Sequence, residues 1–559
     1  MQKNLVEKSI SHLIQNSIDE LSEEFPIVSQ GHIPIQMEVP KDRRHGDLCT
    51  NVAFRLSGLI GQKPIEIAQK LNLLVGNHLK HSRIKKAIKR IEVKPPGYVN
   101  FWLSEKVFYN TLSDIYKTKG NFGKINIGAN KKILLEFVSA NPTGPLTIAH
   151  ARQAAAGDSL ANILEFCGYS VKREYYINDE GLQMSLLADS VRARYLELSK
   201  RGSTFPENGY KGAYVYDIAK ELKKQHKEKF LEEKKPWKEF FLKFSYTSIM
   251  TDIKRDLKDF NVKFDAWYSQ TKLGKSGEVE KKIEFLRTRK YVYEKDGALW
   301  FKSTEFGDDK DRVIRKSDGT YTYLAPDIAY HHNKFSRGFN KLINIWGPDH
   351  HGYVPRIKAA IQAMGFQESD LAIILIQLST LFREGKPVSM STRQGEFVTL
   401  RELVGEVGKD AARFFFVMRK TDSHLDFDLE LAKKHSPQNP VYYVQYAHAR
   451  ICSILKKANL AYIPGAKLDI LKEQEEINLI KFLWRFTHVI ESCGFYLEPH
   501  GLCSYLQELA KTFHSFYDKH RVIGEDADLS KARLFLVNCT RIVLANGLKL
   551  LGVSAPKKM

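Results

Sequence analysis

Alternating apolar runs and amphipathic stretches between residues 133 and 177 predict one well-defined supersecondary unit. The run "ILLEFV" (133–138) is continuously apolar apart from one glutamate, which is typical of a strand covered on both faces. The Pro/Gly-rich turn "SANPTGPL" follows, then a helix predicted from about 148 to 167, then the strand "SVKREYYI". This strand–helix–strand order predicts a parallel sheet with a right-handed crossover.

A second alternation between about 320 and 380 has the same character. "APDIAYHHNKF" predicts a helix, "KLINIWG" a strand, "YVPRIKAAIQAMG" a helix and "LAIILIQL" a strand. The intervening segment, about 185–300, is mostly helical and lysine-rich by pattern, and a solvated insertion is favoured over a binding site. Together the two halves predict a Rossmann-like α/β fold built on a parallel sheet.

The two ends of the chain have different patterns. The first 110 residues predict an α+β unit, with helical stretches at 4–22 and 64–79 and strand-like alternation in "IEVKPPGYVNFWLS". From about 401 the pattern is almost wholly helical, which predicts an appended bundle. The expected domains are an N-terminal domain (1–110), an α/β core (111–400), a connecting helical segment (401–435) and a C-terminal all-α domain (436–559).

Composition narrows the class of protein. Apolar residues make up 43% and charged residues 27% of the 559-residue chain, which is ordinary for a globular protein. The six cysteines form no CxxC pair, so a zinc ribbon is excluded and a reducing compartment is favoured. The N-terminal stretch lacks the apolar core of a secretory signal, and no apolar run reaches about 18 residues. We therefore expect a cytoplasmic protein with no membrane association.

The formal net charge of +21 points to a polyanionic partner, of which a nucleic acid is the commonest. An evenly basic surface, inherited from a lysine-rich proteome, would produce the same number without a binding patch. Charge alone leaves both interpretations open.

Candidate chemistry gathers where strands are expected to end. In open α/β sheets, ligands bind beyond the carboxyl ends of the strands. The predicted loop 139–150 places backbone N–H groups and His150 at a helix N-terminus, which suits a phosphate. Gly144 and the two prolines of this loop fix the turn and let a ligand approach the backbone.

Two further loops are expected at the same edge. Loop 347–352 carries Asp349, His350 and His351, and the polar loop 379–397 carries several cations. Each loop alone is more often an ordinary turn, but three at one edge of a basic protein favour a phosphate-binding site. A metal-dependent hydrolase built on the Asp-His-His run is a weaker alternative, because adjacent histidines rarely face one ion.

Longer motifs run through nearly the whole chain: "HGDLCTNVAFRL", "PPGYVNFWLS", "EFVSANPTGPL", "REYYINDEG", "YLAPDIAYHHNKF", "IWGPDHHGYVPRIKAA", "MSTRQGEFVTL", "NPVYYVQYAHARI" and "NGLKLLGVSAPKKM". In these motifs the chain resembles the class I arginyl-tRNA synthetases of the bacterial type. The resemblance implies a monomeric ligase that uses ATP with Mg²⁺ to form arginyl-AMP and passes the arginyl group to tRNA(Arg). It also implies that the N-terminal domain meets the tRNA elbow and that the C-terminal domain binds the anticodon.

The resemblance implies an arginine site and a nucleotide site. Glu136 and Asn141 would hold the amino-acid end of arginine, with Tyr323 and Asp327 around the guanidinium, whose planar fork of donors is best read by a carboxylate. The alternative role for Glu136 is structural: it would form an ion pair with a local arginine instead of contacting the substrate. Asn141 would also lie near the adenosine, together with Gly144, Gly347, Asp349 and His350.

Both class signatures are altered in this chain. In place of His-Ile-Gly-His stand Thr147, Ile148, Ala149 and His150, and in place of Lys-Met-Ser-Lys-Ser stand Ser389, Met390, Ser391, Thr392 and Arg393. Losing one donor aimed at developing charge costs about 10²–10³ in rate. The nearest candidate replacement cations are Arg152, Arg383, Lys386 and Arg393. The chain is therefore expected to be an active ligase, and the alternative is an activation-impaired paralogue that binds tRNA.

Overall fold

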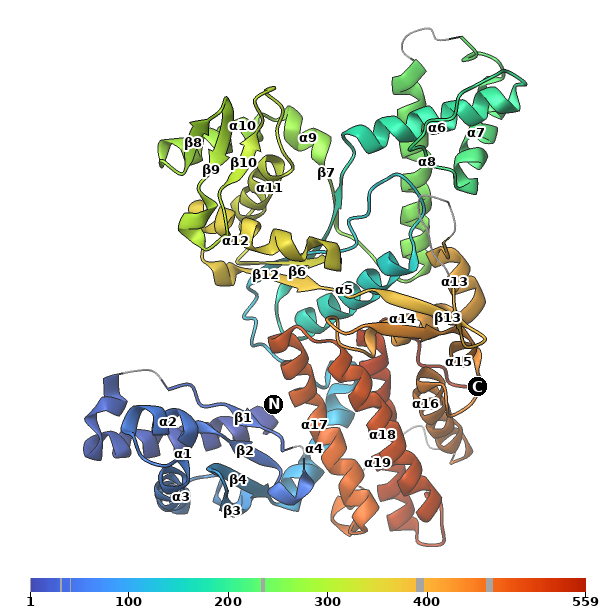
Figure 1. Cartoon of the computed structure of the whole chain (residues 1–559). Coiled ribbons are helices and arrows are strands. Elements are labelled where there is room, and N and C mark those ends of the chain that lie inside the picture. Colours follow the sequence, from blue (N-terminus) through green and yellow to red (C-terminus); the bar gives the residue numbers. More distant parts are fainter. Residues whose placement is uncertain (1, 31–32, 41, 233–236, 389–396, 459–465) are drawn as a thin grey trace.

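A five-stranded parallel sheet forms the centre of the molecule (Figure 1). The computed structural model describes residues 2–30, 33–40, 42–232, 237–388, 397–458 and 466–559. In spatial order the strands are β12 (Leu371–Leu375), β11 (Lys341–Trp346), β5 (Lys132–Glu136), β6 (Ser170–Ile177) and β7 (Ala266–Ser269). The chain moves outward from β5 to β7 and then returns to the other side of β5, so strand order reverses between β5 and β11. This confirms the predicted Rossmann-like core.

Apolar residues of β5 divide between the two faces of the sheet. Ile133 and Leu135 pack in one buried cluster with α5 (Ile148–Phe166), whereas Leu134 packs in a second cluster with α11 (Leu324–Ser336) and α12 (Val354–Ala363). This two-sided burial explains why the strand reads as a continuous apolar run. The bounds of α5 and β6 agree with the predicted ones to within a residue or two.

The segment between β6 and β11 is only partly helical. Three helices, α6 (Leu182–Leu198), α7 (Ala213–His226) and α8 (Trp237–Asp259), project away from the sheet at the upper right of Figure 1. The chain then returns to form β7, followed by α9 (Gln270–Lys275), α10 (Glu278–Thr288) and a three-stranded antiparallel sheet of β8 (Val292–Lys295), β9 (Ala298–Phe301) and β10 (Arg312–Arg315). Strand β7 has too few residues for a periodic signal, and its aromatic side chains stack across the sheet on those of β6.

A second small sheet follows the core, where the pattern predicted a polar loop and then helices. Strands β13 (Ser379–Arg383) and β14 (Lys386–Pro387) form a hairpin, and β15 (Leu425–Asp428) pairs with β13 in parallel. The prediction of almost wholly helical structure from about 401 therefore missed one strand, β15. This strand is stabilised by a partner more than 40 residues away, which a local pattern does not reveal. Around it lie α13 (Leu400–Val407), α14 (Lys409–Val417) and α15 (Leu429–Lys433).

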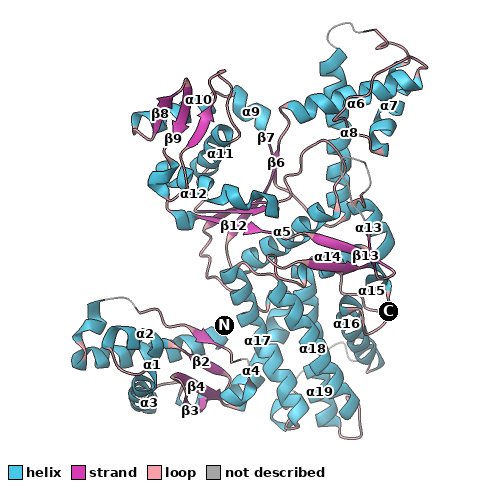
Figure 2. Ribbon diagram, viewed as in Figure 1, coloured by secondary structure: helices cyan, strands magenta, loops and turns pink. Residues whose placement is uncertain are grey.

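The N-terminal domain, followed by α4, packs against the C-terminal helical bundle (Figure 2). The bundle contains α16 (Pro440–Lys457), α17 (Gln474–Tyr496), α18 (His500–Lys519) and α19 (Ala527–Leu550), and α4 (Glu105–Thr118) packs on α17 and α19. The N-terminal domain has an antiparallel sheet of β1 (Met37–Glu38), β2 (Leu48–Thr50), β4 (Tyr98–Leu103) and β3 (Ile88–Lys94), covered by α1 (Gln2–Glu24), α2 (Val52–Ile60) and α3 (Pro64–Lys80). Lys481 ties the two together by donating to buried Asp47 at 2.7 Å. Within the described residues, no helix combines the length and apolarity needed to span a membrane.

Candidate active site at the carboxyl edge of the parallel sheet

The loop that leaves β5 adopts a strained conformation where strand order reverses. Val138 and Ser139, neither of them glycine, have φ values of 66° and 40°. Left-handed backbone is costly for a β-branched residue and is found mainly where function requires it. Tyr214 supports the turn that follows by donating from its hydroxyl to the Thr143 carbonyl at 2.7 Å. A Cβ at Gly144 would lie 3.2 Å from the Tyr214 ring, so Gly144 allows this close packing.

Thr147 and His150 cap the N-terminus of α5. The Thr147 backbone N–H donates to Nδ1 of His150 at 3.1 Å, and the Thr147 hydroxyl lies 3.2 Å from the same nitrogen. Because Nδ1 accepts this bond, the proton of the neutral ring is on Nε2, where it can donate to a ligand. Burial lowers the pKa of His150 to about 4, which keeps the ring neutral at physiological pH. Ile148 is buried in the core, and Ala149 is partly exposed beside the cap.

Asp327 lies in the first turn of α11 and is anchored by a residue that sequence patterns did not single out. The Tyr353 hydroxyl donates to Oδ2 of Asp327 at 2.6 Å. Tyr353 ends the turn 348–353 that follows β11, so its hydrogen bond links this turn to the first turn of α11. Desolvation, with a smaller contribution from the charge of Glu136, raises the pKa of Asp327 to about 7. The Tyr353 hydrogen bond and the Lys334 ammonium act in the opposite direction.

Glu136 is buried at the end of β5 with its charge already balanced. It forms an ion pair with the fully buried ammonium of Lys334, and Ser139 donates to its other oxygen at 3.1 Å. Lys334 also donates to Oδ1 of Asn344 at 3.0 Å, and the Asn344 amide lies 2.8 Å from Nε2 of His331. The alternative of a local cation partner is thus correct in kind, although the cation is a lysine rather than an arginine. Direct contact of Glu136 with arginine stays a prediction.

Other candidates lie around the rim of this edge. Asn141 is exposed and donates to Oε1 of Gln183 at 2.8 Å. Tyr323 caps α11 with 74% of its surface exposed, which leaves its ring available to a ligand. Whether both contact substrate stays a prediction.

The turn after β11 presents exposed polar side chains. Asp349 and His350 lie 3.5 Å apart, and a Cβ at Gly347 would come within 2.5 Å of the Asp349 carboxylate. Across the described ranges, no three His, Cys, Asp or Glu side chains form a group that could hold a metal ion. The run that includes His351 therefore does not form the ligand set that the hydrolase alternative requires.

The second signature falls in a part of the chain that is not described. Ser389, Met390, Ser391, Thr392 and Arg393 lie outside the described residues. Just beyond them, Leu400 donates its backbone N–H to the Leu146 carbonyl at 2.8 Å, and Thr399 bridges to Thr147. The residues that follow the second signature are therefore hydrogen-bonded to the start of the first signature.

The candidate replacement cations differ in availability. Lys386 is exposed on β14, and Arg383 pairs with Glu406 at 2.7 Å. Arg152 is buried and donates to the carbonyls of Gln377, Lys420 and Ser423 at 2.8–2.9 Å. Three of its five N–H donors are thus bonded to backbone carbonyls, and a contribution of Arg152 to phosphate binding stays a prediction.

Three sequence-family models match the chain in order. They are described as arginyl tRNA synthetase N terminal domain (residues 8–103), tRNA synthetases class I (R), catalytic domain (111–434), and DALR anticodon binding domain (444–559).

Similar whole proteins cover nearly the full length. The chain is 46% identical to arginine–tRNA ligase 1 of Halalkalibacterium halodurans over 528 residues, 94% of each chain. It is 44% identical to arginine–tRNA ligase of Bacillus subtilis over 540 residues, 95% of this chain and 96% of the relative. The arginyl-tRNA synthetase structure of Thermus thermophilus shares the fold, with a TM-score of 0.76, 22% identity and coverage of 97% and 99%. The chain therefore belongs to the arginyl-tRNA synthetase family of class I.

Proposed function

We propose that this protein is an arginine–tRNA ligase. It activates L-arginine with ATP to arginyl-AMP and pyrophosphate, and transfers the arginyl group to the 3′ end of tRNA(Arg). The observation that carries the proposal is Asp327, a carboxylate held by Tyr353 at 2.6 Å on the same sheet edge as the α5 N-terminus. A guanidinium on Asp327 and a triphosphate at α5 would bring the two reacting groups together.

The residues of this edge can stabilise the phosphate charge that develops during activation. Backbone N–H groups of the first turn of α5 and Nε2–H of His150 all act as donors to an anion there. ATP is expected to enter with Mg²⁺, which would neutralise part of the triphosphate charge. We further propose that the N-terminal domain (1–110) contacts the tRNA elbow, that the C-terminal domain (436–559) binds the anticodon, and that the protein works as a cytoplasmic monomer.

An aminoacylation assay with L-arginine, ATP and tRNA(Arg) tests the proposal directly. Charged tRNA is the expected product. Tight tRNA binding without arginyl-AMP or arginyl-tRNA would instead identify an activation-impaired paralogue, for which no present observation argues.

Arginine binding is expected to weaken as the pH falls through 7. The pKa of Asp327 is raised to about 7, so this carboxyl is protonated below that pH and loses its attraction for a guanidinium that stays charged throughout. The Kd for L-arginine should rise about tenfold per unit below pH 7 and level off above pH 8. Calorimetric titration between pH 5.5 and 8.5 measures this, and a Kd that is flat across the range would contradict it.

Lys386 is expected to supply part of the missing positive charge. It is exposed on β14, whereas Arg383 on the same hairpin is paired with Glu406. Lys386→Ala should lower the rate of ATP–pyrophosphate exchange by about tenfold, less than a buried donor would because solvent screens the charge. Arg383→Ala is the matched control and should have the smaller effect. Equal rates for Lys386→Ala and the unaltered protein would exclude this lysine.

A further inference from the structure

Helix α5, which carries His150, packs against the sheet largely through small side chains in its first half. Its first half is lined by small buried residues, Ala151, Ala154, Ala155, Ala156 and Gly157. A Cβ at Gly157 would lie 2.5 Å from the Phe137 ring, so the helix packs very close to the sheet. Small side chains allow this approach but interdigitate little, and therefore resist sliding along the helix axis weakly. Directional polar contacts add an axial constraint to the packing of the larger buried side chains of α5, such as Ile148 and Leu160.

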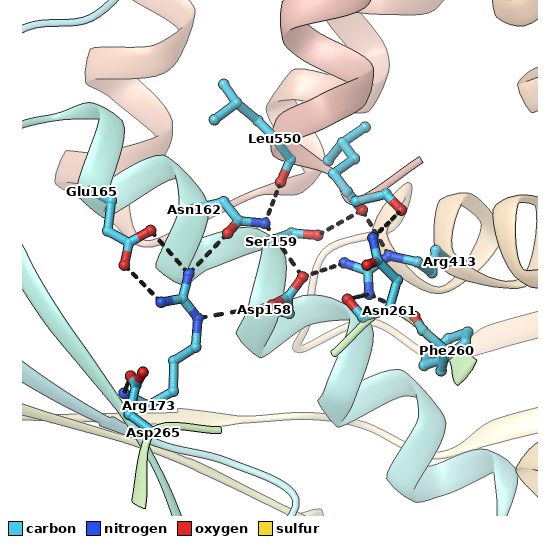
Figure 3. A network of polar contacts seen from close by, with 12 residues as sticks. Asp158, Ser159, Asn162, Glu165, Arg173, Phe260, Asn261, Asp265, Arg413 and Leu550 are labelled. Carbon is cyan, nitrogen blue, oxygen red and sulfur yellow. Dashed lines mark hydrogen bonds and ion pairs between the residues drawn. The ribbon is translucent and has the colours of Figure 1, made fainter. Parts of the chain in front are cut away.

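Arg413 of α14 supplies one such constraint (Figure 3). Its fully buried guanidinium donates to Oδ2 of Asp158 on α5 at 2.6 Å. Its Nε–H donates to the carbonyl of Leu551 at 2.8 Å, and Nη1 donates to the carbonyls of Phe260 at 3.1 Å and Asn261 at 3.3 Å. One side chain thus joins α5, α14, the end of α8 and the turn after α19.

A second arginine, on α5 itself, donates to the segment that follows α14. Arg152 of α5 donates to the carbonyls of Lys420 and Ser423, which lie just beyond the C-terminal end of α14. The segment 409–423 therefore holds α5 at two points in opposite directions. One of these points, Arg152, is two residues from His150.

The C-terminal turn closes the same cluster. Gly552 has φ of 68°, and a Cβ there would lie 2.6 Å from Nε of Arg413. Asn162 of α5 donates to the Leu550 carbonyl at 3.1 Å, and the Ser159 hydroxyl donates to the Leu551 carbonyl at 3.4 Å. The last helix of the bundle is thereby seated directly on the helix that presents His150 to the site.

We propose that Arg413 and Asp158 are positioning residues for adenylate formation. They set the position of α5 along its own axis, together with the turn Leu551–Gly552, whose Leu551 carbonyl accepts from Arg413. This position determines where Nε2–H of His150 points. Asp158 lies eight residues from His150, about 12 Å along the helix, so the pair acts through the helix and not by contact with substrate. Replacing both members of a buried ion pair by apolar residues avoids the cost of a lone buried charge. The carbonyls of Leu551, Phe260 and Asn261 still lose their Arg413 donors, so geometry and stability are measured separately. The inference rests on the proposed function, because activation is its readout.

The test compares two double variants. Arg413→Met with Asp158→Leu removes the pair without leaving a charge buried alone. Arg401→Met with Asp256→Leu is the control, because that half-exposed arginine–aspartate pair joins α13 to α8 and does not touch α5. The first variant should remain folded with a lowered Tm, because three carbonyls lose their Arg413 donors. At a temperature below that Tm, its Kd for tRNA and its KM values should stay within about threefold, while kcat for ATP–pyrophosphate exchange falls at least tenfold. The control should keep the kcat of the unaltered protein.

Two further measurements decide the outcome where activity alone does not. Amide hydrogen exchange in residues 148–158 should accelerate in the first variant and not in the control, which reports on α5 independently of catalysis. Gly552→Ala, which crowds Arg413 from the other side, should lower kcat in the same way. A folded first variant with unchanged kcat and unchanged exchange overturns the positioning role. Absence of arginyl-tRNA with the unaltered protein would instead reject the proposed function, while the exchange result still judges the role of the pair.

Discussion

Replacing Asp327 by asparagine is expected to raise the KM for L-arginine by about 30-fold to about 4,000-fold, while the KM for ATP stays within about threefold. Removing one member of a desolvated charge pair costs about 2–5 kcal/mol, and 1.4 kcal/mol is a factor of ten. Asparagine keeps the size of the side chain and an oxygen for the Tyr353 hydroxyl, which donates to it at 2.6 Å in the unaltered protein. The loss is then one of charge rather than of packing.

L-Citrulline provides the matched test of that substitution, because it replaces the guanidinium by a neutral urea of similar shape. The unaltered protein should prefer arginine strongly, and Asp327→Asn should lose most of that preference. ATP–pyrophosphate exchange with each amino acid, at saturating ATP, gives both KM values. An equal rise in the KM values for arginine and ATP would mean that Asp327 does not bind the guanidinium.

His150→Ala is expected to lower the rate of adenylate formation by about 10²–10³, the usual effect of removing a donor aimed at developing charge. The ring has its proton on Nε2, because Nδ1 accepts the Thr147 backbone N–H at 3.1 Å. Its pKa of about 4 means that no acid limb of the rate near pH 6.5 should come from this residue. Single-turnover formation of arginyl-AMP measures the loss.

Two amide variants separate the donor from the helix cap. His150→Asn keeps an acceptor near the Nδ1 position and so preserves the cap, whereas His150→Gln places an amide N–H nearer the Nε2 position. Gln should recover part of the rate and Asn should not. Full recovery by Asn would show that His150 serves only to cap α5.

Elements with strong local patterns could be predicted from the sequence nearly to the residue. Helix α5 and strand β6 needed only the apolar pattern and a Pro/Gly turn, because α5 is buried along most of its length and the second half of β6 is mostly buried. Strands β7 and β15 escaped prediction because each is only four residues long and is stabilised by a distant partner. The site residues divide in the same way, into those recognised by local motifs and those defined by contacts with residues far away in the sequence.

The sequence by itself determined the α/β class, the sheet edge at which a ligand site is expected, the family resemblance and the residues of both altered signatures. These follow from spacing along the chain, which local physics turns directly into strands, turns and helix caps. Only the tertiary structure decided that Tyr353 anchors Asp327, that Lys334 balances Glu136 and that Arg413 binds Asp158, across separations of 26, 198 and 255 residues. It also showed that Arg152 donates to backbone carbonyls more than 200 residues away. Such pairings depend on which buried charges meet when the elements pack, and no local pattern carries that information.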